Sequence, residues 1–396
     1  MKIRTSIGVV LCAVCPAVAL AQTPIDSVKP ATKIIQPAKK PDSSIFNLNV
    51  LGRTSLNIGQ NKERHLNAGF RLDETRLLLS GNINPDLSYK VRFRLNKSFN
   101  TTTQDNGSRA LDWAQINYRF GKQKDWEVIL GKQAAMVGSY EFANNPVYEY
   151  VFTDYVDRIL NLFVVGATFS HQVNETNTFH LQVYNTSTET FDQLIKTSGY
   201  GTGDFKQSER PMGAYLTWEG KFFNKALQTK WSYNYSQLVA NGDNHALSLA
   251  NMYQSKNTKI YLDLQYSDYG VDHTMLASSP IHAFKGNVGT DRTMLRDVVY
   301  KTAVLRLDQQ LNKSWGISLK GAYETASARK DKEIGNDFRR NWTGYAALEY
   351  KPIVTKDWKL FAGYIDNNIS YKNRMALPSE KNNRFILGTY FNLSAI

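Results

Sequence analysis

The feature that most constrains this chain is a strict alternation of side chains between residues 66 and 99. In its second half large apolar residues alternate with polar or cationic ones, so that one face carries Tyr89, Val91, Phe93 and Leu95 and the other carries Ser88, Lys90, Arg92 and Arg94. A period of two is that of a β-strand with one apolar face. The preceding GNINPD, residues 81–86, predicts a hairpin turn. Such a hairpin fits a soluble sandwich, or a membrane barrel with lipid outside and water inside.

The first residues indicate export. Lys2 and Arg4 form a charged n-region, residues 7–14 an apolar stretch and residues 19–21 a small-x-small cleavage site, so residues 1–21 are predicted to be a cleaved signal peptide rather than a buried strand or helix. Both cysteines, Cys12 and Cys15, lie inside it, so the mature chain would have no disulfide. Residues 22–45 are rich in Pro and Lys and are predicted to be a flexible periplasmic leader, or a contact for a partner or peptidoglycan.

Alternating segments recur along the rest of the chain, residues 46–396, which is predicted to be one domain. Sixteen segments can be marked, including 87–99 and 342–351. Short turns alternate with longer connections, the longest being 133–160, 186–210, 269–298 and 325–341. An even strand number with short turns at one end and long loops at the other is typical of outer-membrane barrels. No fixed-period repeat indicates a propeller, while two or more soluble sandwiches remain an alternative.

Composition favours the membrane alternative. After residue 21 no apolar run approaches the roughly 20 residues of a spanning helix, whereas 22 Tyr, 19 Phe and 7 Trp suit half-buried strands and aromatic girdles. We therefore predict an all-β fold: a transmembrane antiparallel β-barrel of about 16 strands in a bacterial outer membrane, with short periplasmic turns and long extracellular loops. A barrel of this width encloses an aqueous channel, which predicts a porin for passive diffusion of small hydrophilic solutes and ions.

The connection 133–160 is the first candidate functional element. Its sequence, QAAMVGSYEFANNPVYEYVFTDYVDRIL, is aromatic and acidic, and long loops in compact structures are often functional. We predict that it folds into the channel and narrows it; packing over the extracellular rim or an adjacent subunit is the alternative. The side chains expected at this constriction are Tyr140, Glu141, Tyr148, Glu149, Asp154, Asp157 and Arg158.

Cations on the early strands are the second candidate feature. The inward-facing residues expected to line the pore opposite the loop are Arg71, Arg76, Lys90, Arg92, Arg94, Arg119 and Lys132. Lys and Arg lining a channel favour anions, and the formal net charge is +13, of which Lys2 and Arg4 would leave with the signal. The sequence therefore predicts a mild anion preference. The alternative is a solvated wall balanced by Asp73, Glu74, Asp112 and the loop acids.

Catalysis is not expected. The six histidines are scattered without metal-ligand spacing, and no serine motif or nucleophile elbow lies near His180, the one histidine clearly on an inward strand face. We expect no metal and no cofactor. Export and alternation argue against nucleic-acid binding. The expected partners are outer-membrane lipid and lipopolysaccharide, the barrel assembly machinery, and small anionic or neutral solutes. A plugged or solute-specific barrel that presents residues 186–210 and 269–298 as a binding face is the alternative function.

Three stretches resemble the phosphate-selective porin O and P family of Gram-negative bacteria. They are Gly69–Lys97 (GFRLDETRLLLSGNINPDLSYKVRFRLNK), Leu111–Gln133 (LDWAQINYRFGKQKDWEVILGKQ) and Arg384–Leu393 (RFILGTYFNL). The shared features are the basic residues before SGNINP and the GKQ ending of the fifth strand. The resemblance covers nearly the whole barrel, and it implies a sixteen-stranded, homotrimeric porin with basic residues lining the pore. The family's phosphate-selective members carry a lysine cluster at the constriction, where this loop has Arg158 among several acids.

Overall fold

The structure, a computed structural model, describes residues 45–60, 66–100, 107–187, 191, 195 and 198–394. The predicted signal peptide and all of the predicted leader except residue 45 lie outside these ranges. The described residues all belong to one compact unit, Gln36–Ile396. Within them, no helix has both the length and the apolar character needed to cross a membrane.

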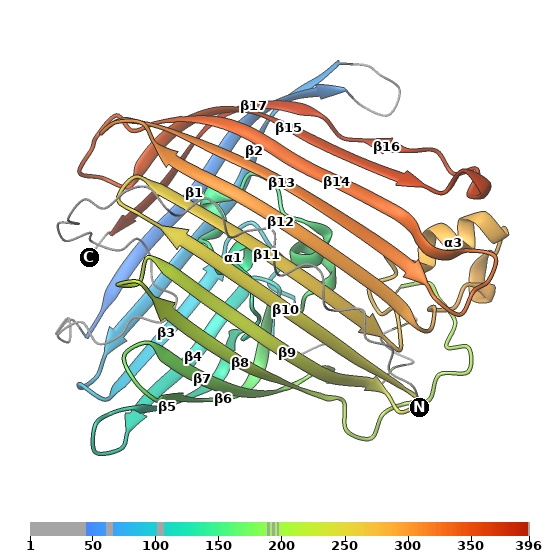
Figure 1. Cartoon of the computed structure of the whole chain (residues 1–396), viewed down its shortest axis with the longest axis horizontal. Coiled ribbons are helices and arrows are strands. Elements are labelled where there is room, and N and C mark those ends of the chain that lie inside the picture. The colour runs from blue at the N-terminus through green and yellow to red at the C-terminus, as the bar shows by residue number, and fades with distance from the viewer. Residues whose placement is uncertain are drawn as a thin grey trace. The chain divides into compact units, whose positions relative to one another are not determined.

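Sixteen of the described strands close into an antiparallel barrel (Figure 1). They are β1 (Asn47–Gln60), β2 (Leu66–Asn82), β3 (Leu87–Arg94), β4 (Leu111–Phe120), β5 (Trp126–Ala134), β6 (Phe163–Gln172), β7 (Asn177–Asn185), β8 (Met212–Phe222), β9 (Leu227–Val239), β10 (Gly242–Gln254), β11 (Thr258–Tyr269), β12 (Val298–Gln310), β13 (Trp315–Ala328), β14 (Gly335–Tyr350), β15 (Trp358–Tyr371) and β17 (Arg384–Ser394). Each pairs with its neighbours in sequence, and β17 closes the ring on β1. The two-residue β16 (Glu380–Lys381) adds to β15.

Helical segments are short and lie in the connections. They are α1 (Tyr140–Ala143), η1 (Pro146–Tyr148), η2 (Tyr155–Ile159), α3 (Ser278–Lys285), η3 (Gly289–Asp291) and η4 (Asn373–Met375). The long connections, including residues 135–162 and 270–297, join strands at one end of the barrel, and short turns such as residues 121–125 and 255–257 join them at the other end.

The two faces of the wall differ as predicted for a membrane barrel. On β13, Leu319 and Tyr323 are exposed on the outside, while Lys320 and Glu324, the residues that follow them, are buried inside. The same alternation holds on β9, where Trp231 and Tyr233 are exposed. Apolar residues therefore face lipid and polar residues face the interior. The predicted sixteen-stranded antiparallel barrel is confirmed, and the sandwich alternative is wrong.

Two strand ends differ from the sequence prediction by more than four residues. The strand β14 begins at Gly335, seven residues before the predicted start at residue 342, because the charged run before Trp342 continues the ladder with β13 and β15. The strand β3 ends at Arg94 rather than at residue 99, and the amide of Leu95 instead donates to the carbonyl of Thr75. Both ends depend on pairing with the neighbouring strands, which the pattern within one strand does not contain.

Two β-bulges turn acidic side chains inward. On β2, Arg53 pairs with Glu74 and Thr54 with Leu72, so Asp73 is the extra residue. On β4, Arg92 pairs with Trp113 and Phe93 with Leu111, so Asp112 is the extra residue. A bulge shifts the alternation by one position. Arg71 and Arg76, five residues apart on β2, can face the interior together only because the Asp73 bulge lies between them.

Replacing Gly388 by alanine is expected to weaken closure of the barrel. A Cβ at this position, where β17 pairs with β1, would lie 2.2 Å from the Thr54 carbonyl oxygen and 2.7 Å from Cζ of Phe361. The backbone must move, at a cost of about 1–3 kcal/mol. The measurement is the heat-modifiable fraction on unboiled gels after refolding. Gly69→Ala is the matched control, because nothing lies within 4 Å of its Cβ position; equal folded fractions for the two variants would contradict the prediction.

Candidate functional site

Residues 135–162, which connect β5 to β6 and are called the inner loop below, lie inside the barrel. The amide of Met136 donates to Gln182 on β7 at 3.0 Å, and the amide of Gly138 donates to Ser232 on β9 at 2.8 Å. The hydroxyl of Tyr155 lies 3.0 Å from Ser248 on β10. These partners are inward-facing side chains, so the loop crosses the interior along the later strands (Figure 1).

The helix α1 is seated on β11 by a carboxylate. The hydroxyl of Ser139 accepts from the amide of Phe142 as an N-cap and donates to Asp263 at 2.8 Å. The amide of Glu141 also donates to Asp263, at 2.9 Å. A serine at a helix start is the local signal for such a cap. The Asp263 carboxylate of the barrel wall accepts hydrogen bonds from the capped turn and so attaches α1 to β11.

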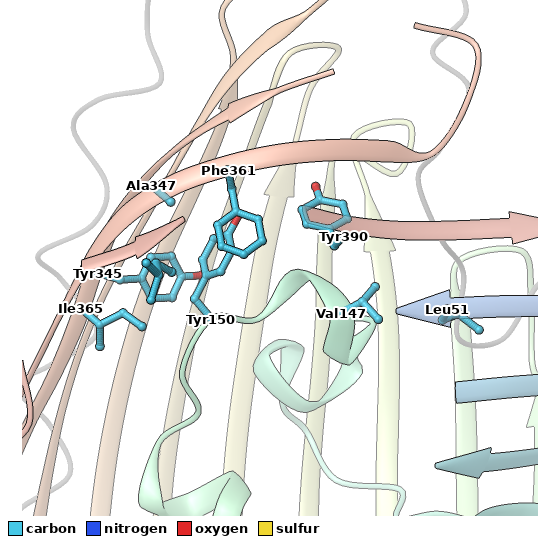
Figure 2. Close-up of a cluster of buried hydrophobic side chains, with 9 residues drawn as sticks. Leu51, Val147, Tyr150, Tyr345, Ala347, Phe361, Ile365 and Tyr390 are labelled. Atoms are coloured by element: carbon cyan, nitrogen blue, oxygen red, sulfur yellow. The ribbon is translucent and has the colours of Figure 1, made fainter. Parts of the chain in front are cut away.

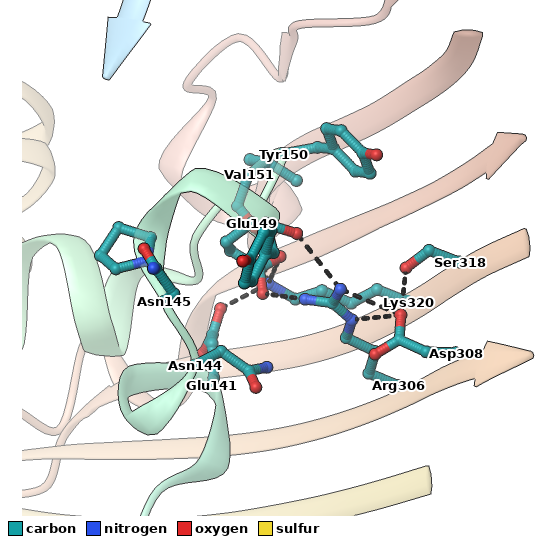
Figure 3. A network of polar contacts seen from close by, with 12 residues as sticks. Glu141, Asn144, Asn145, Glu149, Tyr150, Val151, Arg306, Asp308, Ser318 and Lys320 are labelled. Carbon is teal, nitrogen blue, oxygen red and sulfur yellow. Dashed lines mark hydrogen bonds and ion pairs between the residues drawn. The ribbon is translucent and has the colours of Figure 1, made fainter. Parts of the chain in front are cut away.

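An ion cluster fixes the centre of the inner loop (Figure 3). Lys320 on β13 lies between Glu141, which it contacts directly, and Glu149, at 3.1 Å. Arg306 on β12 binds Glu149 at 2.7 Å and Asp308 at 2.9 Å. The side chains of Lys320, Glu141 and Glu149 are fully buried. Both loop carboxylates are therefore neutralised by the wall behind them and do not present their charge to the channel.

The third loop acid is neutralised in the same way. Asp154 forms an ion pair of 2.7 Å with Arg339 on β14, and its amide donates to Glu324 at 2.8 Å. Asp157 and Arg158 follow in η2 and are both exposed. Because this adjacent pair carries opposite charges, the exposed part of the loop has no formal net charge.

An apolar cluster holds the part of the inner loop around Val147 and Tyr150 (Figure 2). Tyr150 packs against Tyr345 and Phe361, with ring centroids 5.2 and 4.8 Å apart, and donates to Glu349 at 2.8 Å. The rest of the cluster comes from the loop and from the inner faces of β1, β14, β15 and β17: Leu51, Val147, Ala347, Ile365, Ile386 and Tyr390. The interior wall is thus apolar where the loop docks.

The remaining predicted loop residues are also held in place. Tyr148 donates to Asp357 and packs against Tyr390 at 4.9 Å, and Tyr140 packs against Tyr261 on β11 at 6.3 Å. Burial raises the pKa of Tyr140 and Tyr148, and the Asp357 carboxylate raises that of Tyr148 further. Both phenols are therefore neutral, and they act as packing and donor groups.

Three of the predicted pore cations converge on one carboxylate. Arg92 Nε lies 2.9 Å from Asp112 Oδ2, Arg94 Nε lies 2.7 Å from Oδ1, and Arg76 binds the same carboxylate. The Asp112 side chain is fully buried, and Arg76 also pairs with Glu74 at 3.0 Å. Three guanidinium groups around Asp112 and Glu74 leave an excess of positive charge in this cluster.

The other predicted pore cations lie apart from the cluster. Arg119 pairs with Glu127 at 3.5 Å. Arg71 is exposed, and it faces the interior because it lies opposite the inward Ser55. Lys90 is half-buried on the same face of β3 as Arg92. Lys132 is buried, directly after a glycine with a φ of +112°.

The wall residues that hold the inner loop were not identified from the sequence. They include Arg306, Lys320 and Arg339, and also Arg53 on β1, which donates to the carbonyls of Pro146 and Val147. A signal does exist: these cations occupy the inward positions of their strands. The pairs that Arg306, Lys320 and Arg339 form with the loop acids join residues more than 150 positions apart, and the alternation carries no information on those contacts.

A serine and an acid lie beside His180 in the structure, although neither belongs to a catalytic sequence motif. Ser170 Oγ is 2.7 Å from His180 Nδ1, and Glu219 is 3.8 Å from Nε2 and 3.3 Å from Lys230. His180 is 1% exposed and Ser170 5%. The arrangement is a buried polar contact within the wall. No cluster suited to a metal ion occurs in the part of the chain that the structure describes.

Solved structures with the same fold include bacterial outer-membrane proteins. The chain aligns with the outer membrane channel DcaP of Acinetobacter baumannii at 12% identity and a TM-score of 0.58, over 88% of this chain and 96% of that one. It aligns with a trimer form of OmpT of Vibrio cholerae at 13% and 0.54, over 89% and 100%. An anion-selective porin from Comamonas acidovorans gives 11% and 0.54, over 88% and 100%. At these identities the likeness shows the fold.

The family follows from the sequence match. No curated protein matches the chain. Residues 52–393, nearly the whole barrel, match the family described as phosphate-selective porin O and P, which confirms the resemblance found in the sequence. The chain therefore belongs to the phosphate-selective porin O and P family and is an outer-membrane porin channel.

Proposed function

We propose that small hydrophilic solutes and ions diffuse passively through this barrel, with a mild preference for anions, phosphate being one candidate. The passage runs between the inner loop, which acts as the constriction, and the wall formed by β2 to β5. Export by a cleaved signal peptide and assembly as a homotrimer belong to the same proposal. The trimer is supported by the trimer form of the V. cholerae neighbour.

The observation that carries the proposal is the unequal distribution of charge. Glu141, Glu149 and Asp154 on the inner loop are each paired with a cation of β12 to β14. They are therefore unavailable to balance the cations across the channel. Those cations share few acids, since Arg76, Arg92 and Arg94 converge on Asp112. A positive lining in a low-dielectric wall attracts anions and raises their local concentration.

The name of one neighbour is consistent with this direction. The structure from C. acidovorans is described as that of an anion-selective porin. Its identity to this chain is only 11%, so the support comes from the shared barrel architecture, and the selectivity of this chain rests on its own charge pattern.

The double substitution Arg71→Gln and Lys90→Gln is expected to reduce the anion preference. Neither side chain forms an ion pair with another described residue, so the substitutions remove lining charge without breaking an ion pair. In a planar bilayer with a salt gradient, the parent should give an anion-favouring reversal potential, and the variant should shift it toward zero, with a permeability ratio roughly twofold to fivefold lower.

Lys313→Gln is the matched control, because Lys313 is exposed in the turn between β12 and β13 at the short-turn end. If the parent conducts but does not prefer anions, the barrel is an open channel whose basic lining does not select anions. A folded, heat-modifiable parent without conductance steps would instead indicate a plugged barrel that serves as a binding surface.

A further inference from the structure

Two cations face the lipid side of the wall near its long-loop end. They are Lys301 on β12 and Arg340 on β14, and both are exposed. Their chain neighbours point inward: Thr302 donates to Glu324 at 3.2 Å, and Arg339 binds Asp154 of the inner loop. Because successive side chains of a strand point to opposite faces, Lys301 and Arg340 point outward.

The two cations lie at one level of the barrel. Lys301 pairs with Thr325 on β13, and Thr325 pairs with Arg340, so the three residues form a row across neighbouring strands. With strands about 4.8 Å apart, the backbones of the two cations are about 10 Å apart. The long side chains can therefore approach one ligand group from either side of Thr325.

Aromatic residues show how deep this row lies. The next outward row toward the short turns contains Tyr323 paired with Trp342, each 46% exposed. At the other end of the same two strands, Trp315 packs against Tyr350 with centroids 4.7 Å apart. Aromatic girdles flank the apolar band of a membrane barrel on both sides. Lys301 and Arg340 therefore lie immediately beyond the girdle of the long-loop end.

The spacing of the two aromatic rows fits a membrane. From Trp315 to Tyr323 the strand advances about 27 Å, or about 20 Å along the barrel axis at a tilt of about 40°. The apolar band of such barrels is about 25 Å tall. The row of Lys301 and Arg340 is thus placed at the headgroups of the leaflet on the long-loop side, which is the outer leaflet.

The neighbouring cations at this end are already occupied. Arg329 binds Asp268, Lys330 binds Asp297 at 2.7 Å, and Lys285 binds Asp331 at 2.7 Å. The side chains of Lys301 and Arg340 form no hydrogen bond or ion pair with any other residue in the described ranges. Two unpaired cations facing lipid at headgroup depth are suited to an anionic headgroup.

We propose that Lys301 and Arg340 form a binding site for a phosphate group of lipopolysaccharide in the outer leaflet. The guanidinium of Arg340 offers paired donors that match phosphate oxygens, and Lys301 adds a point charge from the other side. Tyr323 and Trp342 below the row pack against the first segment of the acyl chains. This site lies on the outside of the wall and is independent of what passes through the channel.

The test is binding of purified lipopolysaccharide to the refolded mature protein in detergent, measured by native mass spectrometry over a lipid titration. The double variant Lys301→Gln and Arg340→Gln should bind about thirtyfold more weakly, as expected for the loss of two cations at a headgroup surface. Lys313→Gln, which removes an exposed cation at the opposite end, should bind like the parent. Equal affinity of the double variant and the parent would overturn the proposal.

Two further lipids identify the recognised group. Lipopolysaccharide stripped of its phosphates should bind the parent as weakly as intact lipid binds the double variant; strong binding would overturn the phosphate assignment. Phosphatidylglycerol should bind weakly, and binding as tight as that of lipopolysaccharide, with the same dependence on the two residues, would overturn the assignment to this glycolipid.

A charge-conserving variant separates binding from folding. Lys301→Arg with Arg340→Lys should retain most of the affinity, and it carries the test if the neutral variant does not fold. Heat-modifiability and single-channel conductance of each folded variant should equal those of the parent, because neither residue faces the channel. Loss of affinity in the charge-conserving variant, with folding and conductance intact, would contradict a site that depends on charge.

Discussion

Replacing Lys320 by methionine is expected to loosen the inner loop and to produce larger, noisier conductance steps. Lys320 is the only side chain in the described structure that contacts both Glu141 and Glu149, and all three are fully buried. Removing one partner of a buried ion pair costs about 3–5 kcal/mol, because the remaining charge is left uncompensated. The ladder of the barrel is untouched, so the cost falls on docking of the loop.

The remaining anchors limit the size of the change. Arg306 still binds Glu149, Arg339 still binds Asp154, and Tyr150 still packs in the apolar cluster. The loop should therefore fluctuate around its docked position, and the barrel should still fold. Single-channel recordings measure the step size and open-channel noise, and limited proteolysis measures exposure of the loop.

A double variant tests whether the effect of Lys320→Met comes from the uncompensated charge or from the loss of the lysine side chain. Lys320→Met combined with Glu141→Gln removes both members of the closest pair and leaves Glu149 with Arg306. Replacing a buried pair together is often close to neutral, so the double variant should return most of the way to the conductance of the parent. Parent-like recordings and protease resistance for Lys320→Met alone would show that the ion cluster does not hold the loop.

Replacing Asp112 by asparagine is expected to increase the anion preference. The carboxylate is shared by Arg76, Arg92 and Arg94. Removing it leaves the buried Arg76 and Arg92 and the half-buried Arg94 with Glu74, which pairs with Arg76. One unit charge about 6–10 Å from a permeating ion changes the energy of that ion by roughly 0.4–1 kcal/mol, when the dielectric constant lies between those of protein and bulk water. The anion-to-cation permeability ratio should therefore rise about twofold to fivefold.

The same substitution should also destabilise this part of the wall. Unpaired buried cations cost about 3–5 kcal/mol, which should lower the temperature at which the heat-modifiable form is lost. Glu175→Gln is the control, because Glu175 is exposed in the turn between β6 and β7. An unchanged reversal potential in Asp112→Asn would show that the arginine cluster does not face the conducting path, and a shift toward cations would contradict the proposed lining.

Strand positions were predictable because their cause is local. A wall one residue thick between lipid and water requires alternation on each strand, and that pattern can be seen in segments such as residues 87–94 without knowledge of any partner. The errors lie where a partner determines the end. The charged residues before Trp342 resemble a loop, yet Arg339 pairs in the ladder and binds Asp154, so β14 extends to Gly335.

The candidate site was predictable by residue type but not by pairing. The aromatic and acidic character of residues 133–160, and the cations of the early strands, are evident in the sequence. Which cation meets which acid is not. Glu141 and Lys320 are 179 positions apart and come together only because the loop crosses the interior to β13.

The sequence by itself determined the class of wall, the number of strands and the excess of positive charge on the early strands, because each follows from alternation or composition. Only the tertiary structure decided where that charge remains unbalanced. The bulges at Asp73 and Asp112 place two acids among the arginines. The acids of the inner loop form ion pairs with Arg306, Lys320 and Arg339. Electrostatic pairing depends on distance in space, and closure of the barrel creates those distances between strands far apart in the chain.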